Sequence, residues 1–438
     1  MSREMKDSGI EWIGEIPKDW EIRNIKYLFS FGKGLNITKE NLKEQGVAVI
    51  SYGQIHSKLN PFYKISDDLI RFVDESYLKT GNLSLVNQGD FIFADTSEDV
   101  QGCGNFIYVD GQQTMFAGYH TIILRSLAQK DNKFFAFLFM SDCWRKQIRE
   151  CVNGVKLFSI SQKLIKKTSI LIPPEDEKVR IVNYLEEHCV TVDNVLEKTC
   201  ANIEEYKKLK QAVITQAVTK GIRGNRELKD NGIEWIGEIP VEWEERRIKT
   251  LFNLRKERNF SPLEEVNLIS LYTDLGVVQH SELEKTTGNK ASNADGYKTV
   301  YRDDIVVNII LCWMGAIGRS EYNGVTSPAY DVYIPRNEVL SKFYHYYFRT
   351  KGFSGDCYKR GKGIMAMRWR TYSDQFRDIR VVYPSLEEQR EIVNYLDQKC
   401  AAIDELIAKK EQYLSEIENY KKSLIYEYVT GKKKVPQE

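Results

Sequence analysis

The chain has 438 residues, with 63 Lys and Arg residues against 62 Asp and Glu residues and a net charge of +1. Hydrophobic residues make up 42% and charged residues 29%, which is typical of globular rather than disordered chains, and roughly 100–200 residues per domain predicts about two to four domains. The balanced charge excludes a uniformly basic nucleic-acid binder, so any DNA-facing surface must be a local basic patch.

The sequence also argues against a membrane or secreted protein. The longest apolar run, 305–318, is shorter than the roughly 20 residues that span a bilayer, and it contains Asn308. The first residues lack an apolar signal region. The eight cysteines form no Cys-x-x-Cys pair, which indicates reduced, mostly buried thiols rather than a metal site or a disulfide framework. We therefore expect a cytoplasmic protein.

Taken in chain order, the sequence contains the same frame twice. Residues 7–20 read DSGIEWIGEIPKDW and residues 230–243 read DNGIEWIGEIPVEW, an offset of 223. A second match follows at an offset of 211, because IVNYL at 181–185 recurs at 392–396. Each half thus has a shared opening, a divergent middle and a shared closing segment. Two matched blocks in the same order predict an internal duplication.

The two divergent middles carry short β-rich runs, each followed by an aromatic, helix-like run at 132–146 and 341–353. This alternation predicts two mixed α/β domains within an α+β fold. The expected divisions are a first domain over 1–173 with its opening motif at 7–20, a long helix over 174–221, a linker and second domain over 222–383 with its opening motif at 230–243, a second long helix over 384–431, and a tail over 432–438.

The closing segments have the features of long helices. From Glu175 to Lys220 there is no proline or glycine, while Pro173 and Pro174 precede the segment and Gly221 follows it. Apolar residues recur at the 3/4 spacing of a coiled-coil seam. The predicted seam contains Leu185, Val192, Leu196, Ile203, Tyr206 and Val213 in the first segment, and Leu396, Ile403, Ile407, Leu414, Ile417 and Leu424 in the second. We expect the two helices to run antiparallel, in a pseudo-two-fold, ring-like monomer with neighbouring termini.

Recognisable catalytic motifs are missing from the sequence. It contains no GxxxxGK[ST] phosphate loop, no HExxH and no GxSxG, and the five histidines are scattered. The acidic runs at 173–180 and 384–391 are explained by the positive end of a helix dipole. A duplicated chain with two unlike middles and no catalytic set is typical of a two-headed recognition protein.

Local basic clusters indicate that the molecule being recognised is negatively charged. Residues 145–167 contain seven Lys and Arg residues against Glu150, and residues 351–380 contain eight against three Asp residues. Both clusters contain glycine and precede a long helix, so they predict contact with a phosphate backbone. The alternative is an ordinary solvated face.

Polar loop residues are candidates for reading base edges, because Arg, Lys, Asn and Gln pair with guanine and adenine. Any single one of them can equally be an ordinary surface residue. The candidate DNA-binding residues include members of both basic clusters. They are Lys33, Asn36, Thr38, Tyr52, Gln54, His56, Lys58, Thr96, Ser97, Gln101, Arg149 and Lys156 in the first half, and Lys256, Arg258, Asn259, Tyr272, Thr273, Gln279, Arg319, Arg360, Lys362 and Arg368 in the second.

Three motifs together resemble the specificity subunit of type I restriction-modification systems. They are GIEWIGEIPxxW at the opening of each half, PSLEEQREIVNYLD at 384–397 and YEYVTGKK at 426–433. The resemblance covers essentially the whole chain. In the first half it departs from the motif, because Lys178 and Val179 stand where the second half has Gln389 and Arg390.

The resemblance implies that each middle is a target recognition domain reading one half of a bipartite, gapped sequence in double-stranded DNA. It implies that the helices set the spacer and dock two modification (methyltransferase) subunits, through the helix starts and closing runs, and that restriction/translocase subunits join this complex. S-adenosylmethionine, ATP and Mg²⁺ are then expected on the partner subunits and no cofactor or metal on this chain.

Two other classes of function remain open from the residues alone. A duplicated coiled-coil adaptor that binds other proteins predicts no affinity for duplex DNA even with partners supplied. A degenerate nuclease or methylase predicts catalysis by the purified chain with Mg²⁺ or S-adenosylmethionine. Within the resemblance, the sequence does not distinguish a methylating system from one that also cleaves DNA.

Overall fold

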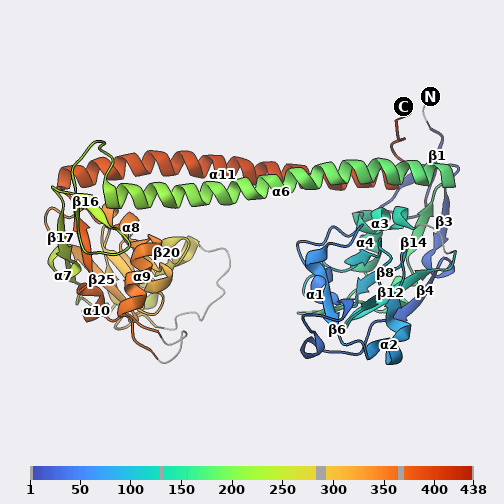
Figure 1. Cartoon of the computed structure of the whole chain (residues 1–438), viewed down its shortest axis with the longest axis horizontal. Helices are drawn as coiled ribbons and strands as arrows, with labels where there is room; N and C mark the ends of the chain where they lie inside the picture. The colour runs from blue at the N-terminus through green and yellow to red at the C-terminus, as the bar shows by residue number, and fades with distance from the viewer. Residues whose placement is uncertain (1–2, 129–131, 155, 283–292, 364–368, 437–438) are drawn as a thin grey trace. The chain divides into compact units, whose positions relative to one another are not determined.

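The computed structural model describes residues 3–128, 132–154, 156–282, 293–363 and 369–436, and the chain divides into two compact units. Unit 1 contains Met1–Cys200 and Gln412–Glu438, and unit 2 contains Ala201–Glu411. The two long helices, α6 (Glu175–Lys220) and α11 (Leu386–Val429), are each divided between the units (Figure 1). Each unit therefore combines the opening and middle of one half with helical segments from both halves.

In unit 1 the opening motif forms small antiparallel pairs around a buried tryptophan. Strand β1 (Met5–Asp7) pairs with β2 (Glu15–Pro17), and β3 (Glu21–Asn24) pairs with β14 (Ser169–Ile172), the strand that leads into α6. The opening and the end of the middle are thus hydrogen-bonded neighbours. Trp20, between β2 and β3, is fully buried in the main core.

Two four-stranded sheets form the centre of the middle of unit 1. The first sheet is antiparallel, in the order β10-β8-β12-β4, and the second has the order β6-β5-β11-β7 with β5 and β11 parallel. The first contains β4 (Phe29–Lys33), β8 (Phe91–Ala94), β10 (Phe106–Tyr108) and β12 (Thr121–Ser126); the second contains β5 (Val47–Ile50), β6 (Arg71–Val73), β7 (Leu85–Val86) and β11 (Met115–Ala117).

The aromatic run predicted as helical in this middle forms α3 (Lys133–Met140) and α4 (Asp142–Arg149). Their rings pack on the first sheet, where the centroid of Phe139 lies 5.1 Å from that of Phe91 and the centroid of Trp144 lies 5.7 Å from that of Phe93. At the start of α3, Lys133 forms an ion pair with Glu186 of α6. The middle is therefore attached to the long helix by charge as well as by apolar packing.

Unit 2 repeats this frame with different sheet connections. Strands β15 (Leu228–Asp230) and β16 (Glu238–Pro240) pair, as do β17 (Glu244–Arg247) and β26 (Arg380–Tyr383). A four-stranded antiparallel sheet has the order β18-β25-β22-β23. Its strands are β18 (Phe252–Leu254), β22 (Ile305–Asn308), β23 (Ile317–Arg319) and β25 (Tyr330–Pro335), beside the pairs β19 (Ile269–Tyr272) with β20 (Gly276–Gln279) and β21 (Lys298–Val300) with β24 (Gly324–Thr326).

The helices that follow the sheet in this middle are α8 (Ser341–Phe348), α9 (Lys351–Arg360) and α10 (Ser373–Arg377). Helix α8 occupies the place that α3 has in unit 1, because Lys342 near its start pairs with Asp397 of α11 at 2.7 Å. Tyr346 donates a hydrogen bond to the same carboxylate at 2.8 Å. Both middles are thus joined to a long helix at matching positions, which confirms the predicted α+β duplication.

The predicted long helices are confirmed, with 46 residues in α6 and 44 in α11. In unit 1 the rings of Tyr184 and Tyr428 lie 4.6 Å apart and Lys421 contacts Asp193 at 2.5 Å, so the helix segments are antiparallel. In unit 2, Lys210 contacts Asp404 at 2.6 Å. Every predicted seam residue is buried or half-buried, namely Leu185, Val192, Leu196, Ile203, Tyr206, Val213, Leu396, Ile403, Ile407, Leu414, Ile417 and Leu424.

The predicted proximity of the termini is confirmed within unit 1, which holds both. Gly431 adopts a φ of 68°, and a Cβ at this position would lie 2.4 Å from Pro17. The chain just after α11 therefore passes so close to the opening motif that only glycine fits. Within the described part of the chain, no helix is long and apolar enough to cross a membrane.

Candidate nucleic-acid interface and helix face

A buried Trp–Glu–Arg contact repeats in both units and fixes the start of each long helix. In unit 1, the indole of Trp20 donates to Glu177 at 3.0 Å, and Arg3 pairs with the same carboxylate at 2.5 Å. In unit 2, the indole of Trp243 donates to Glu388, also at 3.0 Å. The acidic residues at the helix starts were predicted only to favour the helix dipole. One carboxylate at each start also accepts a hydrogen bond from the tryptophan of the opening motif.

The second copy of this contact is completed by Arg226, which forms an ion pair with Glu388. Arg3 and Arg226 are related by the opening offset, and Glu177 and Glu388 by the closing offset. Each carboxylate is nearly buried and faces both an indole N–H and a guanidinium, so its charge is compensated by hydrogen bonds as well as by its partner's charge. The repeat therefore conserves a complete local unit of structure within one chain.

The departure at the helix starts has a structural explanation. The buried side chain of Gln389 accepts a hydrogen bond from the backbone of Leu340 at 2.8 Å and donates to the Pro384 carbonyl at 2.9 Å. It therefore joins α11 to the middle of unit 2. Lys178, at the matching place in unit 1, lies over the ring of Phe135. The difference between the copies at this position is internal.

The basic cluster of unit 1 divides into structural and exposed members. Arg145 is buried and donates to the Phe139 carbonyl at 2.9 Å, and burial lowers the pKa of its guanidinium to about 9. Arg149 donates to the Gln101 carbonyl and to Asp142, each at 2.8 Å, and its side chain is only 13% exposed. Arg149 is therefore a brace between two segments rather than a free cation.

The lysines that follow α4 in this cluster form the basic surface. Lys156, Lys163, Lys166 and Lys167 are exposed. The amine of Lys166 lies over the ring of Phe31, whereas Lys156, Lys163 and Lys167 take part in no ion pair among the described residues. Their charges are thus not neutralised by neighbouring carboxylates, so they are available to an anionic partner.

The structure brings two of the candidate base-reading groups of unit 1 together. Helix α1 (Tyr52–Ile55) lies beside β9 (Thr96–Ser97), where His56 contacts the Thr96 carbonyl at 2.8 Å. His56 also contacts the amide of Asn105 through its second ring nitrogen. Tyr52 packs edge-on against Tyr119. These side chains make a continuous surface, but both nitrogens of His56 are already engaged.

Two of these candidates require correction. Ser97 is 2% exposed and its hydroxyl donates to the Asp99 carbonyl, so it cannot reach DNA. The side chain of Gln54 accepts from the Ser51 N–H at 3.1 Å and caps α1. The candidates of unit 1 that the structure leaves exposed are Lys33, Asn36, Thr38, Lys58, Gln101 and Lys156.

In unit 2 the clearest correction is Arg319. Its side chain is 11% exposed and pairs with Asp303 at 2.5 Å and with Glu321, so it stabilises the end of β23 instead of presenting a guanidinium. Asn259 donates to two backbone carbonyls, at 2.9 and 3.0 Å, and Gln279 accepts from Asn267 at 3.0 Å. These side chains are structural in the same sense.

Other candidates of unit 2 remain on the surface. Arg258 is exposed although it donates to the Gly296 carbonyl at 3.0 Å, and Arg360 is exposed with a long contact of 3.5 Å to Asp378. Arg368 lies outside the described residues. The candidates whose side chains are exposed are Lys256, Arg258, Tyr272, Thr273, Arg360 and Lys362.

Sequence reasoning missed an aromatic surface beside the second basic cluster. Trp313, Tyr358 and Trp369 come from three separate segments. The centroid of the Tyr358 ring lies 5.6 Å from that of Trp313 and 5.0 Å from that of Trp369. The available signal was the presence of aromatic residues inside glycine-containing and basic runs, LCWMG and CYKRGKG. Nothing in the sequence shows that these runs meet.

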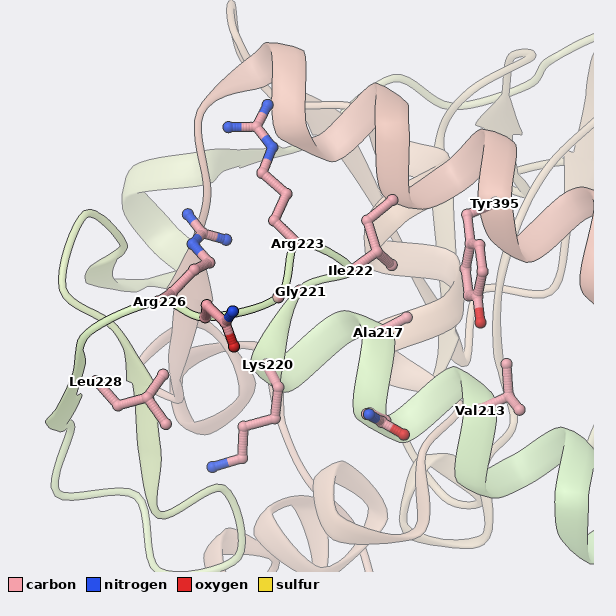
Figure 2. Close-up of a pocket in the computed structure, with 12 residues that line it drawn as sticks. Val213, Ala217, Lys220, Gly221, Ile222, Arg223, Arg226, Leu228 and Tyr395 are labelled. Atoms are coloured by element: carbon pink, nitrogen blue, oxygen red, sulfur yellow. The ribbon is translucent and has the colours of Figure 1, made fainter.

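Figure 2 shows a cavity in unit 2, where the end of α6 meets α11 and the following loop. Its volume is about 420 Å³, and its lining includes Val213, Ala217, Ile222 and Tyr395. At the matching place in unit 1, Tyr428 stands where unit 2 has Ala217, and its ring packs on Tyr184. The cavity therefore opens beside a small side chain at the position where unit 1 has an aromatic ring.

Apolar side chains also lie exposed on the helices of each unit. In unit 2, Leu209 and Leu406 are 50% and 43% exposed, and in unit 1, Tyr420 is 54% exposed at the position that matches Leu209. Exposed apolar groups at matching positions are typical of a surface that another protein covers. Within the described ranges, no group of three or more His, Cys, Asp or Glu side chains is placed to hold a metal ion.

Comparison with known proteins gives a consistent set of relatives. The family model described as "Type I restriction modification DNA specificity domain" matches residues 17–205 and 240–418. A Methanocaldococcus jannaschii protein provisionally named the type I restriction enzyme MjaX specificity subunit is 24% identical over 442 residues, covering 97% of this chain and 96% of that protein.

Two further matches support the same grouping. The type I restriction enzyme MjaVIII specificity subunit of the same organism is 23% identical over 214 residues, covering 48% of each chain. A chain in a solved structure concerned with complex assembly and conformational transition of the type I R-M system has a TM-score of 0.68 and 16% identity, covering 94% of this chain and 98% of that one. The last likeness shows a shared fold.

Proposed function

Because the chain belongs to the family of type I restriction modification DNA specificity domains, we propose that it is the DNA sequence-specificity subunit of a type I restriction-modification complex. Each middle reads one half of a bipartite, gapped target in double-stranded DNA. The long helices set the spacer between the half-sites and dock the methyltransferase subunits.

One observation supports this proposal above the others. The Trp–Glu–Arg contact and the lysine bridge from the middle to the long helix are repeated in both units, whereas the described parts of the exposed loops of the two middles share no such repeat. A subunit that recognises two different half-sites needs a common frame and two unlike surfaces. An adaptor with two equivalent binding heads needs two like surfaces.

The exposed cations support DNA as the ligand. Lys156, Lys163 and Lys167 of unit 1 and Lys362 of unit 2 follow the α4 and α9 helices in their respective middles and carry charges that no described carboxylate pairs. Phosphate contacts of this kind position a protein on duplex DNA, and base edges are then read by neighbouring polar side chains. The net charge of +1 is compatible with this because the cations are local.

We further propose that this chain has no catalytic role of its own. S-adenosylmethionine, ATP and Mg²⁺ would be bound by the modification and restriction/translocase subunits, and two modification subunits would occupy the helix face. The exposed Leu209 and Leu406 of unit 2 and Tyr420 of unit 1 are helix side chains that we propose for these contacts. The purified chain supplied with S-adenosylmethionine and target DNA should therefore transfer no methyl groups, and activity should appear only with its partners.

The test is methylome sequencing of cells that express the modification subunit with and without this chain. We expect a bipartite, gapped methylated motif that is present only when this chain is expressed. Cells that lack the modification subunit but express this chain provide the matched control and should show no such motif. A motif that persists without this chain, or one without a gap, would contradict the proposal.

A further inference from the structure

A braced loop in unit 2 presents apolar side chains to solvent. Residues 309–316 connect β22 to β23, and Asn308 accepts hydrogen bonds from the backbone N–H groups of Ile310 and Leu311 at 3.0 and 3.3 Å. The indole of Trp313 donates to the Ile310 carbonyl at 2.9 Å. Gly315 closes the loop at a φ of 90°. The loop conformation is thus set by internal hydrogen bonds, before any ligand binds.

Two further segments extend this surface. The ring of Tyr358, at the end of α9, lies 5.6 Å from that of Trp313 and stacks on Trp369 at 5.0 Å. The indole of Trp369 donates to the Tyr358 carbonyl at 3.1 Å. A Cβ on Gly361 would lie 2.2 Å from the Trp369 ring, so the glycine lets the indole lie flat on the backbone.

The outward side of this assembly is apolar. We call Leu311, Met314, Tyr358 and Tyr372, with the neighbouring rings of Trp313 and Trp369, the aromatic surface. The first four residues are 37%, 53%, 49% and 44% exposed. The polar edges of both tryptophans are already bonded to backbone carbonyls, so their remaining exposed area offers apolar contact. Contiguous apolar area of this kind on a folded protein marks a binding surface.

Cations flank the aromatic surface and indicate the charge of its ligand. Lys362 and Arg370 face each other in an antiparallel bridge, with N–O distances of 2.9 and 3.0 Å, directly beside Gly361 and Trp369. Both side chains are exposed, and neither takes part in an ion pair within the described ranges. Aromatic rings beside cations are the combination with which proteins bind single-stranded nucleic acids, and apolar side chains also contact the thymine methyl group in the major groove of duplex DNA.

Among the residues of unit 1 that the structure describes, no such surface lies at the matching place. The end of α4 there carries Arg149, which contacts the 95–105 loop through the Gln101 carbonyl, where α9 places Tyr358 against Trp313. In that loop, the side chain of Val100 is 38% exposed. The two middles therefore offer different chemistry at one position of a common frame.

We propose that the aromatic surface of unit 2 makes a salt-independent contact with the sugars and bases of one DNA half-site, flanked by phosphate contacts from Lys362 and Arg370. The contact rests on the proposed function, because it assumes that unit 2 binds duplex DNA. It assigns apolar, non-ionic recognition to unit 2 and leaves unit 1 with predominantly ionic and polar recognition.

The test is equilibrium binding of the assembled complex to duplex DNA that carries its methylated target motif, measured from about 50 to 200 mM salt. Met314→Ala combined with Tyr358→Ala should weaken binding about tenfold or more at every salt concentration and leave the salt slope unchanged. Lys362→Ala combined with Arg370→Ala should make the plot of log K against log salt shallower, reducing the magnitude of its slope by about 2. Leu127→Ala, which truncates a 60% exposed side chain in unit 1, is the matched control and should bind like the wild type.

Each other outcome has a definite meaning. Tyr358→Phe keeps the ring and should retain wild-type affinity. Wild-type affinity of the Met314→Ala/Tyr358→Ala complex would overturn the inference, as would failure of that variant to assemble with its partner subunits, which would assign the surface to a protein. If the wild-type complex does not bind its own motif, the proposed function fails instead.

Discussion

Units 1 and 2 differ most where one frame carries different side chains. Both fasten a long helix with a buried tryptophan and a carboxylate, at the same donor–acceptor distance of 3.0 Å. Yet Tyr428 occupies the place in unit 1 where Ala217 leaves a cavity of about 420 Å³ in unit 2. The comparison shows that the duplicated chain keeps the contact that fastens each helix start and varies the buried packing where the end of one long helix meets the start of the other.

The sharpest way to break this comparison is to remove the shared tryptophan from either unit. Trp20→Ala and Trp243→Ala should each lower the free energy of unfolding by about 3–5 kcal/mol, because each deletes a fully buried ring and leaves a carboxylate without its indole donor. Urea-induced unfolding of the full chain measures both. A large loss from one substitution and a small loss from the other would show that the two tryptophans do not contribute equally to stability.

The next prediction concerns the cavity, where each unit shows which side chain the matching position of the other unit can hold. Tyr428→Ala should cost about 3 kcal/mol, since it opens a cavity beside Tyr184. Ala217→Tyr should change stability by less than about 1 kcal/mol, because the existing space accepts the ring. The same unfolding measurement applies. A cost of Ala217→Tyr equal to that of Tyr428→Ala would mean that the unit 2 cavity is not the counterpart of the Tyr428 site.

Acid should affect unit 2 through His345. Burial, with Arg349 and Arg319 nearby, lowers the pKa of His345 to about 3, and its Nδ1 accepts a hydrogen bond from the Arg319 N–H at 3.1 Å. The unfolded chain binds a proton near pH 6.5 whereas the folded chain does not. Stability from this group is therefore complete above pH 6.5 and falls by up to about 1.4 kcal/mol per pH unit as the pH drops toward the folded pKa.

The control for this prediction is His345→Gln, which keeps an acceptor for the Arg319 N–H without the titration. Between about pH 6 and pH 4, wild-type stability should fall more steeply than that of the variant by that amount per unit. Unfolding midpoints in urea at several pH values give the comparison. Parallel pH profiles would remove His345 from the account of acid sensitivity.

The smallest expected effect concerns the lysines of unit 1. Lys156→Ala should reduce the salt slope of target binding by about 1, because one phosphate contact is lost, with little change in sequence preference. Arg149→Ala should instead lower stability, since Arg149 braces the Gln101 loop. Binding titrations at several salt concentrations distinguish these roles. A changed sequence preference for Lys156→Ala would place this side chain at a base edge.

Much of the frame could be predicted from the sequence because its signals are local and repeated. The Pro173, Pro174 and Gly221 boundaries and the 3/4 spacing place α6 within one residue of its observed ends. The candidate interface was less predictable, because exposure of a polar side chain depends on partners in other segments. Arg319 is a partial exception, since Glu321 lies two residues away on the same side of an extended chain and could have indicated an ion pair.

Ser97 and the aromatic surface show the limit more clearly. A serine in a polar loop is indistinguishable in sequence from one buried in a two-residue strand. Trp313, Tyr358 and Trp369 are separated by 45 and 11 residues, and the segments that carry them are joined by hydrogen bonds from Thr371 to the backbone of the 309–316 loop and of α9. Such long-range pairing is set by the sheet and helix packing of the whole middle.

The central claim is that two unlike middles each read their own half-site on a common frame. The most direct test replaces residues 244–383 with the corresponding middle of a relative that has a different methylation motif and maps the methylome of cells expressing the hybrid. We expect one half of the bipartite motif to change while the other half is retained. Alteration of both halves, or of neither, would contradict the account.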